Sequence, residues 1–565
     1  MQLYPLLKIN DLSVHFNTER GIVPALKNIS FEVKKGEIVA IVGESGSGKS
    51  VTSLSILQLL PVPPAVYQSG GILFSPEGKE PVDLLKLAPE QMMPVRGNKI
   101  AMIFQEPMTS LNPVFTCGEQ VMEAILLHER VIHSMAKART LELFNRVMLP
   151  EPESIFRRYP HQLSGGQKQR VMIAMAMSCN PSLLIADEPT TALDVTVQKT
   201  ILRLIKQLQV QSGMGVIFIT HDLGVVKEIA DRVIVMYRGE IVEQGSIRQV
   251  YEQPAHPYTK ALLACRPALH PKGSRLPVVS DFMGHIRQPV ATVSLPIQHA
   301  LLNEPEVLME VEHLKVWFPA KKALFGKDRA FIKAVDDVSF KVLKGETLGL
   351  VGESGCGKST LGRALLRLIE PTAGKIIFRG RNLTSISESE LRAMRKDMQL
   401  IFQDPYSSLN PSLPIGAAIM EPLKVHGLYG NDGNRKEKTI DLLIKVNLQA
   451  DHFKRYPHEF SGGQRQRVVI ARALALNPSF IICDESVSAL DVSVQAQVLN
   501  LLNDLKKEFQ FTAIFISHDL SIVRYISDRI MVMNKGRIVE TGTAEQVYFH
   551  PVSDYTRQLI DAIPG

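Results

Sequence analysis

The strongest constraint on the fold is an octapeptide that occurs twice. Residues 43–50 read GESGSGKS and residues 352–359 read GESGCGKS. Each follows an apolar run typical of a buried strand (residues 37–42 and 346–351) and precedes a segment of helix-forming composition. A glycine-rich turn between a strand and a helix presents backbone N–H groups, and the helix adds the positive end of its dipole. The pattern therefore predicts a phosphate-binding loop in each half of the chain.

Each loop is predicted to bind ATP and Mg²⁺. The ammonium groups of Lys49 and Lys358 are expected to reach the β- and γ-phosphates, and the hydroxyls of Ser50 and Ser359 are expected to bind the metal. The predicted ATP-binding residues are Gly43, Glu44, Ser45, Gly46, Ser47, Gly48, Lys49, Ser50 and Val51, and in the second copy Gly352, Glu353, Ser354, Gly355, Cys356, Gly357, Lys358, Ser359 and Thr360. Val51 lacks the hydroxyl of Thr360, so one contact to the α-phosphate is expected to be missing in the first copy.

The two halves carry the same motifs in the same order. Corresponding residues lie 309 positions apart at the phosphate loop, 298 apart at Gln105 and Gln403, and 297 apart at three later motifs. Strand patterns alternate with helical patterns in each half, which predicts an α/β fold with a mixed or parallel sheet core. Residues 118–180 and 415–478 are rich in helical patterns and are expected to form an inserted helical subdomain. We predict domains at 1–265 and 306–565, joined by a proline-rich surface linker at 266–305.

Two acids follow a short apolar run in each half, Asp187-Glu188 and Asp484-Glu485. Open α/β sheets bind ligands at the carboxyl ends of their strands, where these acids are expected to lie. We predict that Asp187 and Asp484 hold Mg²⁺ and that Glu188 and Glu485 orient the attacking water, because phosphoryl transfer depends on positioning and charge neutralisation. An isolated acidic pair also serves as a helix N-cap, but its place after a strand and downstream of a phosphate loop favours catalysis.

Four further side chains are candidates for the same sites. Gln105 and Gln403 carry neutral amides that could coordinate Mg²⁺ or hold water, although an exposed polar role is the alternative. His221 and His518 follow apolar runs at 216–220 and 513–517 and are predicted to be catalytic through hydrogen bonds to the γ-phosphate or water. A structural histidine is the alternative for each.

A serine and two glycines open a helical segment in each half. Ser164, Gly165, Gly166 and Gln167 have the counterparts Ser461, Gly462, Gly463 and Gln464. A hydroxyl, bare N–H groups and a helix dipole together form an anion site, so these residues are predicted to contact ATP. An ordinary N-cap explains one copy considered alone equally well.

Composition excludes several classes of protein. The net charge is +7, and no run of five or more Lys and Arg residues occurs, so nucleic acid is not an expected partner. The chain has neither a secretory signal pattern nor 18 consecutive apolar residues, so it is expected to be neither secreted nor membrane-spanning. Its five cysteines are far apart in sequence and are expected to be reduced thiols in a cytosolic protein.

Together with Leu163-Ser-Gly-Gly-Gln167 and Ala192-Leu-Asp194, these motifs resemble the nucleotide-binding domain of ATP-binding-cassette transporters. The resemblance implies that Phe16 and Phe318 stack on adenine, with a packed strand aromatic as the alternative. It also implies that the two cassettes face head to tail, so that each ATP lies between one phosphate loop and the opposite serine. One site then combines Lys49, Glu188 and His221 with Ser461 and Gly463, and the other combines Lys358, Glu485 and His518 with Ser164 and Gly166.

A narrower resemblance concerns transport direction. The strings RYPHQLSGG (158–166), RYPHEFSGG (455–463) and PAHPYT (254–259) resemble ATPases of the peptide, opine and nickel uptake group, and residues 103–115 resemble fused ATPases of bacterial glutathione importers. This implies a peripheral protein on the cytoplasmic face of the inner membrane. Its implied partners are two membrane-spanning permease subunits and a periplasmic or extracellular substrate-binding protein.

The cargo and one rival function stay open. The resemblance orders the cargo as glutathione, dipeptides, longer peptides and a metal chelate. Some members of the uptake group carry a cysteine cluster after the Tyr-Thr tail, whereas here no cysteine lies between Cys265 and Cys356, so no iron–sulfur cluster is predicted. The rival is a soluble twin-cassette ATPase acting on ribosomes or nucleic acid. That class typically has a long charged helical linker, whereas this linker is proline-rich and sparsely charged.

Overall fold

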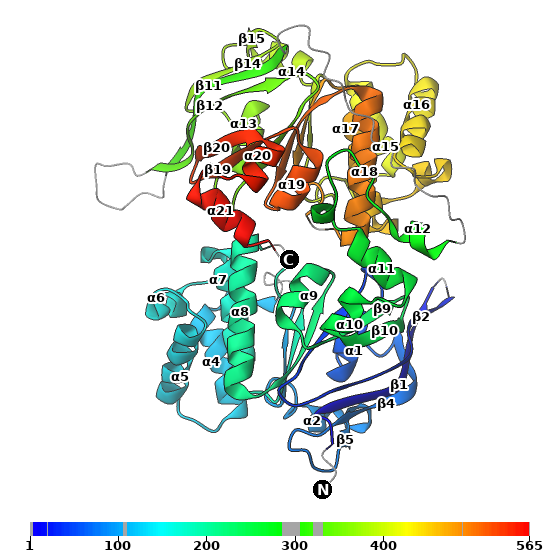
Figure 1. Ribbon diagram of the computed structural model, residues 1–565, viewed down its shortest axis with the longest axis vertical. Helices are drawn as coiled ribbons and strands as arrows, with labels where there is room; N and C mark the ends of the chain where they lie inside the picture. The colour runs from blue at the N-terminus through cyan, green and yellow to red at the C-terminus, as the bar shows by residue number, and fades with distance from the viewer. Residues whose placement is uncertain are drawn as a thin grey trace.

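A computed structural model describes residues 4–19, 21–105, 110–191, 193–284, 306–319, 331–488 and 490–563. The two halves have the same architecture and lie one above the other, the first from blue to green and the second from green to red (Figure 1). The predicted α/β class and the repeat are therefore confirmed. Among the helices within these ranges, none is both long enough and apolar enough to cross a membrane.

Each half is built on a six-stranded central sheet. The strand order is β10-β9-β3-β8-β7-β6 in the first half and β20-β19-β13-β18-β17-β16 in the second, and only the β9–β10 and β19–β20 pairs are antiparallel. Every residue of β3, β7 and β8 is buried, because other elements cover both faces of the sheet. The strands are β3 (Ile38–Val42), β6 (Ile100–Ile103), β7 (Leu183–Asp187), β8 (Gly215–Thr220), β9 (Arg232–Tyr237), β10 (Glu240–Ser246), β13 (Thr347–Val351), β16 (Met398–Ile401), β17 (Phe480–Asp484), β18 (Thr512–Ser517), β19 (Arg529–Asn534) and β20 (Arg537–Thr543).

A second, antiparallel sheet lies beside each central sheet and was not predicted from the sequence. Its order is β2-β1-β4-β5 in the first half and β12-β11-β14-β15 in the second. The buried residues of β1 share one hydrophobic core with β3 and the helix after the phosphate loop. The strands are β1 (Leu7–Thr18), β2 (Gly21–Val33), β4 (Ala65–Phe74), β5 (Val82–Asp83), β11 (Val307–Pro319), β12 (Phe331–Leu343), β14 (Ala373–Phe378) and β15 (Arg381–Asn382).

The predicted helical insert is present in both halves. Thr116 caps the first helix, with its hydroxyl accepting the Glu119 N–H while the Glu119 carboxylate accepts the Thr116 N–H. The helices share a core with β7 and β8, so the insert is fused to the sheet. They are α4 (Cys117–His128), α5 (His133–Arg146), α6 (Pro152–Arg157) and α7 (Gly165–Ala176), and α15 (Ile415–Val425), α16 (Asp432–Lys445) and α17 (Gly462–Leu474).

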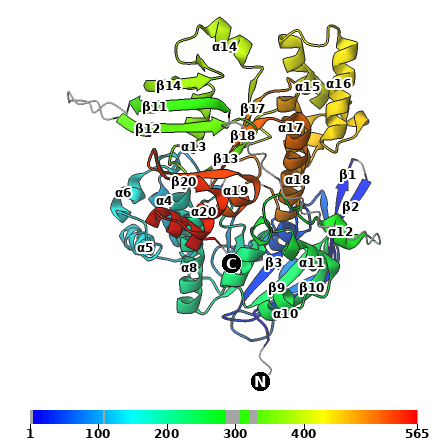
Figure 2. The same ribbon diagram turned by 45° about the horizontal axis from the view of Figure 1, so that its top comes forward.

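The remaining helices flank the sheets and join the halves. In both views α11 lies against α18 of the second half, and α21 lies against α8 of the first (Figures 1 and 2). Each half therefore packs a tail helix on the other half's long helix. The helices are α1 (Lys49–Ile56), α2 (Pro89–Met92), α8 (Val195–Ser212), α9 (Leu223–Ile229), α10 (Ile247–Glu252), α11 (Pro257–Ala264), α12 (Val279–Met283), α13 (Lys358–Leu365), α14 (Glu388–Met394), α18 (Val492–Phe509), α19 (Leu520–Ile526), α20 (Ala544–Phe549) and α21 (Asp554–Asp561), with short 3-10 turns at Leu84–Lys86, Pro160–Gln162, Pro267–Leu269, Ala450–Lys454 and Pro457–Glu459.

Part of the predicted linker is packed instead of lying on the surface. Leu276 is fully buried, and its backbone N–H and C=O both pair with the side-chain amide of Asn500, at 2.9 and 2.8 Å. The Tyr525 hydroxyl donates to the Ser274 carbonyl at 2.6 Å. The expected surface position is wrong here, because the second half supplies polar partners for this backbone. Residues 285–305 lie outside the described ranges, and the domain boundaries stay a prediction.

Candidate nucleotide sites

The phosphate loops connect β3 to α1 and β13 to α13, as predicted. A Cβ added to Gly43 would lie 2.2 Å from the Met236 carbonyl oxygen, so only glycine fits there. The buried Lys49 ammonium donates to the carbonyls of Gly43 and Glu44, at 2.7 and 2.9 Å. Lys358 makes the same two contacts in the second half, at 2.8 and 2.9 Å. Burial lowers the pKa of Lys49, although the negative charges of nearby carboxylates act to raise it.

The loop serine and the strand-end aspartate meet in each half. The Ser50 hydroxyl lies 3.4 Å from Asp187 Oδ1, and the Ser359 hydroxyl lies 2.8 Å from Asp484 Oδ1. Burial raises the pKa of both aspartates. The serine hydroxyl and the aspartate carboxylate that converge here are hard oxygen donors of the kind that Mg²⁺ prefers. These residues therefore fit the predicted metal.

The strand-end glutamate is held at the centre of each site. Glu188 has a left-handed backbone with φ of 48°, and its N–H donates to the Ile219 carbonyl at 2.9 Å. Its carboxylate accepts from the Gln105 amide at 3.2 Å and the Thr191 hydroxyl at 2.9 Å, and it pairs with His221 Nδ1 at 3.2 Å. Positive φ outside glycine is a strained state that functional sites retain. These contacts aim the carboxylate instead of leaving it solvated.

The second site repeats this arrangement with one difference. The Gln403 amide donates to Glu485 Oε2 at 2.7 Å, and His518 Nδ1 lies 3.6 Å from Glu485 Oε1. The Ser488 hydroxyl, which corresponds to Thr191, donates to the Glu485 backbone carbonyl at 3.0 Å. Among the described residues, the Glu485 carboxylate therefore receives no counterpart of the hydroxyl contact that Thr191 gives to Glu188.

Electrostatics keep each glutamate ionised. Burial opposes ionisation of Glu188, but the hydrogen bond and charge of His221 lower its pKa to about 2. Burial also opposes protonation of His221, yet the neighbouring carboxylate raises the pKa of the imidazole. The pKa values of Glu485 and His518 shift in the same directions for the same reasons. Each pair thus places an ionised carboxylate beside an imidazole whose protonated form the carboxylate stabilises.

The structure brings the predicted glutamines to the glutamates and leaves their metal role a prediction. The serines cap helices, as the alternative proposed: the Ser164 hydroxyl accepts the Gln167 N–H at 3.3 Å, and the Gln167 side chain accepts the Ser164 N–H at 3.0 Å. Ser461 and Gln464 form the same box. Phe16 is half-buried on β1, and Phe318 is 39% exposed on β11. The ATP contacts of these serines and phenylalanines stay predictions.

The two halves meet head to tail through their phosphate loops. The Ser45 N–H donates to Asp491 Oδ2 of the second half at 2.9 Å, and the Ser354 N–H donates to Asp194 Oδ1 of the first at 3.3 Å. Asp194 and Asp491 were not among the predicted site residues, although the repeat keeps both at an offset of 297. The neighbouring Ala192 lies outside the described residues.

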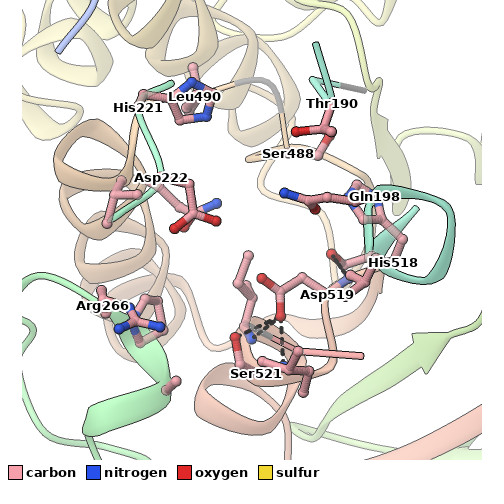
Figure 3. A pocket seen from close by; sticks show the side chains of 18 of the residues that line it. Thr190, Gln198, His221, Asp222, Arg266, Ser488, Leu490, His518, Asp519 and Ser521 are labelled. Atoms are coloured by element: carbon pink, nitrogen blue, oxygen red, sulfur yellow. Dashed lines mark hydrogen bonds between the residues drawn. The ribbon is translucent and has the colours of Figure 1, made fainter. Parts of the chain in front are cut away.

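A cavity of about 140 Å³ lies between the two sites. Its walls come from both halves, with His221 and Asp222 facing His518 and Asp519 (Figure 3). Asp519 accepts hydrogen bonds from the N–H and hydroxyl of Ser521, at 2.8 and 2.6 Å. The two glutamate–histidine pairs are therefore separated by a shared polar space.

Comparison with known protein families identifies the family of this chain. A family model described as ABC transporter matches residues 26–191 and 335–488, together more than half of the chain. The chain belongs to the ABC transporter family. Each half is an ATP-binding cassette, and the protein is an ATPase of this family. A second model, the C-terminal region of oligopeptide/dipeptide transporters, matches residues 242–284 at the end of the first cassette.

Relatives match this chain over nearly its whole length. The glutathione import ATP-binding protein GsiA of Salmonella choleraesuis is 50% identical over 564 residues, which cover 99% of this chain and 89% of the relative. The Escherichia coli K12 protein of the same name is 50% identical over 567 residues, with the same coverage. A solved dimeric structure of a bacterial ABC transporter cassette is 31% identical and covers 43% of this chain and 99% of that chain, with a TM-score of 0.39.

Proposed function

We propose that this ABC ATPase drives the import of small peptides, with glutathione as the first candidate cargo. The observation that carries the proposal is the 50% identity to glutathione import ATP-binding proteins over 99% of the chain. The match of residues 242–284 to the oligopeptide/dipeptide transporter region supports the same class of cargo. The cargo itself would cross the membrane elsewhere, so none of the residues described above would touch it.

The two sites would act on ATP bound between the cassettes. Lys49 and Lys358 would leave their loop carbonyls for phosphate oxygens, and Ser50 with Asp187, and Ser359 with Asp484, would hold Mg²⁺, which neutralises phosphate charge when bound. Glu188 and Glu485 would orient the attacking water, and the paired histidines would donate toward the γ-phosphate.

ATP binding and hydrolysis would change the contact between cassettes. The phosphate-loop contacts to Asp491 and Asp194 already cross the interface, at 2.9 and 3.3 Å. ATP would add its own contacts to both cassettes and favour the closed state, and hydrolysis would remove them. A ligand shifts such an equilibrium only by its differential affinity for the two states. This cycle would supply the motion that the transporter uses.

The helical inserts offer surfaces for two membrane-spanning permease subunits. In the second cassette a groove of about 400 Å³ is lined by Phe402, Val425, His426 and Arg472. In the first, Val114 and Phe115, just before α4, are 70% and 53% exposed. Exposed apolar side chains of this kind would suit a protein partner. The chain would thereby sit on the cytoplasmic face of the inner membrane, and a substrate-binding protein would deliver cargo from the other side.

Uptake assays in a strain deleted for this chain test the proposal. We expect labelled glutathione or dipeptides to accumulate when the wild-type chain is restored, and to remain outside when Glu188→Gln and Glu485→Gln are introduced together. Co-purification with membrane-embedded subunits is expected in both cases. Equal glutathione uptake with and without the chain would remove glutathione as the cargo. Co-purification with ribosomes and without permeases would favour the rival soluble function.

A further inference from the structure

Each cassette ends in a tail helix whose tyrosine reaches back to its own phosphate loop. The Tyr258 hydroxyl on α11 accepts the Glu44 backbone N–H at 2.9 Å, and the Tyr555 hydroxyl on α21 accepts the Glu353 N–H at 3.0 Å. Tyr258 is fully buried and its ring packs on Tyr237, with centroids 4.4 Å apart. The contact therefore ties a segment far downstream to the first turn of the loop.

A glutamate on the last strand fixes each tail. Glu243 on β10 accepts the backbone N–H groups of Ala255 and His256, at 2.7 and 3.0 Å. Glu540 on β20 accepts those of Val552 and Ser553, at 2.8 and 3.0 Å. Because these bonds satisfy N–H groups at the start of the tail helix, they set the position from which the tyrosine extends.

The repeat keeps this arrangement where the surrounding sequence differs. Ser553-Asp554 replaces His256-Pro257, yet both the tyrosine and the anchoring glutamate recur at an offset of 297. The tyrosine is thus retained in the second copy although the two residues before it are not.

The Glu44 residue held by Tyr258 has two other contacts. Its carbonyl accepts from the Lys49 ammonium at 2.9 Å, and its carboxylate accepts from the Ser493 hydroxyl of the second cassette. The second loop has the matching set, because the Glu353 carbonyl accepts from Lys358 at 2.9 Å and its carboxylate accepts from the Thr196 hydroxyl at 2.7 Å. A shift of this peptide unit would therefore move the phosphate-binding lysine and the cross-cassette contact together.

We propose that Tyr258 and Tyr555 are positioning residues for ATP binding. Each hydroxyl fixes the orientation of the first peptide unit of its phosphate loop, which places the lysine for the phosphates and the glutamate for the opposite cassette. The tail that matches the oligopeptide/dipeptide transporter region thereby becomes part of the nucleotide site. The inference rests on the proposed ATP sites and is independent of the cargo.

The test variant carries Tyr258→Phe and Tyr555→Phe together in one chain. The control variant carries Tyr251→Phe. Tyr251 lies on α10, the helix before this tail helix, and its hydroxyl donates to the Leu223 carbonyl instead of to the phosphate loop. Each of these substitutions removes only a hydroxyl group that takes part in a hydrogen bond. ATP affinity is measured by equilibrium dialysis, and the melting temperature is measured with and without ATP.

We expect ATP to bind roughly three- to tenfold more weakly to the double variant, which corresponds to the loss of one hydrogen bond per site. The rise in melting temperature caused by ATP should shrink accordingly, while Tyr251→Phe lowers the melting temperature alone. If the double variant fails to fold, the same measurements are made on Tyr555→Phe alone, because Tyr555 is less buried than Tyr258. Wild-type affinity in a folded tyrosine variant would overturn the inference. Absence of ATP binding by the wild-type chain would instead overturn the proposed function.

Discussion

Replacing Glu188 and Glu485 together by Gln is the most direct test of the two sites. Each carboxylate uses its oxygens as acceptors, and Glu188 accepts from Gln105, Thr191 and His221. A glutamine has the same shape but offers one acceptor oxygen and one donor group in place of two acceptors. The NH₂ group of the glutamine would therefore lie opposite groups that are themselves hydrogen-bond donors. The side chain could no longer offer two acceptor oxygens to the attacking water.

The size of the effect follows from the role of the carboxylate. Because the pKa of Glu188 is lowered to about 2, its carboxylate is fully ionised at neutral pH, and the substitution removes a complete charge. Loss of a positioned acid–base group typically lowers turnover by about 10²- to 10⁴-fold. Neither carboxylate contacts the phosphate-loop backbone in the described structure, so ATP affinity should stay equal or increase as negative charge near the γ-phosphate is removed.

Steady-state phosphate release and equilibrium ATP binding measure the two expectations separately. The control is Glu240→Gln, which neutralises a surface carboxylate paired with Lys27 and should leave both values unchanged. Each single variant isolates one site, and comparison of the two reveals whether the extra Thr191 contact makes the first site faster. Turnover of the double variant within about tenfold of wild type would refute the assignment of these glutamates. Loss of ATP binding would refute the expectation that they act after binding.

Three further outcomes follow from the same structure. The pKa of His221 is raised above 6.5 in the folded state, because the favourable effect of Glu188 on protonation exceeds the opposing effect of burial. The contribution of this ion pair to the free energy of unfolding is therefore complete below about pH 6.5, and it is lost as the pH rises through the raised pKa. The difference in denaturation midpoint between wild type and His221→Ala should accordingly narrow from pH ~6 to pH ~9, and a constant difference would contradict the ion pair. Asn500→Leu should leave two buried backbone groups of Leu276 unpaired and cost about 2–5 kcal/mol, visible as a lower denaturation midpoint, whereas Asn503→Ala on the same helix removes one 3.3 Å hydrogen bond and should cost less. Ser359→Ala should raise the Mg²⁺ concentration needed for half-maximal ATPase activity, and it should also lower the melting temperature measured without Mg²⁺ because the hydroxyl donates to Asp484 at 2.8 Å. An unchanged Mg²⁺ requirement would exclude Ser359 from the metal site.

Local pattern was sufficient for the parts of the fold with a regular period or fixed spacing. The buried strands before the loops and before the acids read as continuous apolar runs, and they form β3, β13, β7 and β17. The antiparallel sheets were missed because strands such as β1 are buried unevenly and contain register shifts, which weaken the alternation that identifies a strand. The packing of Leu276 was missed because proline content describes chain stiffness and does not reveal partners such as Asn500.

The amino-acid sequence by itself determined that this chain contains two ATP-binding cassettes, because a phosphate loop requires particular residues at adjacent positions and this pattern occurs twice. The family resemblance implied a head-to-tail arrangement, and only the tertiary structure revealed the residues through which the units meet. The contacts of Asp491 and Asp194 with the opposite loops, and of Tyr258 and Tyr555 with their own, join residues more than 150 positions apart. Such contacts depend on how sheets and helices pack, and a local pattern of residue types carries no information about that packing.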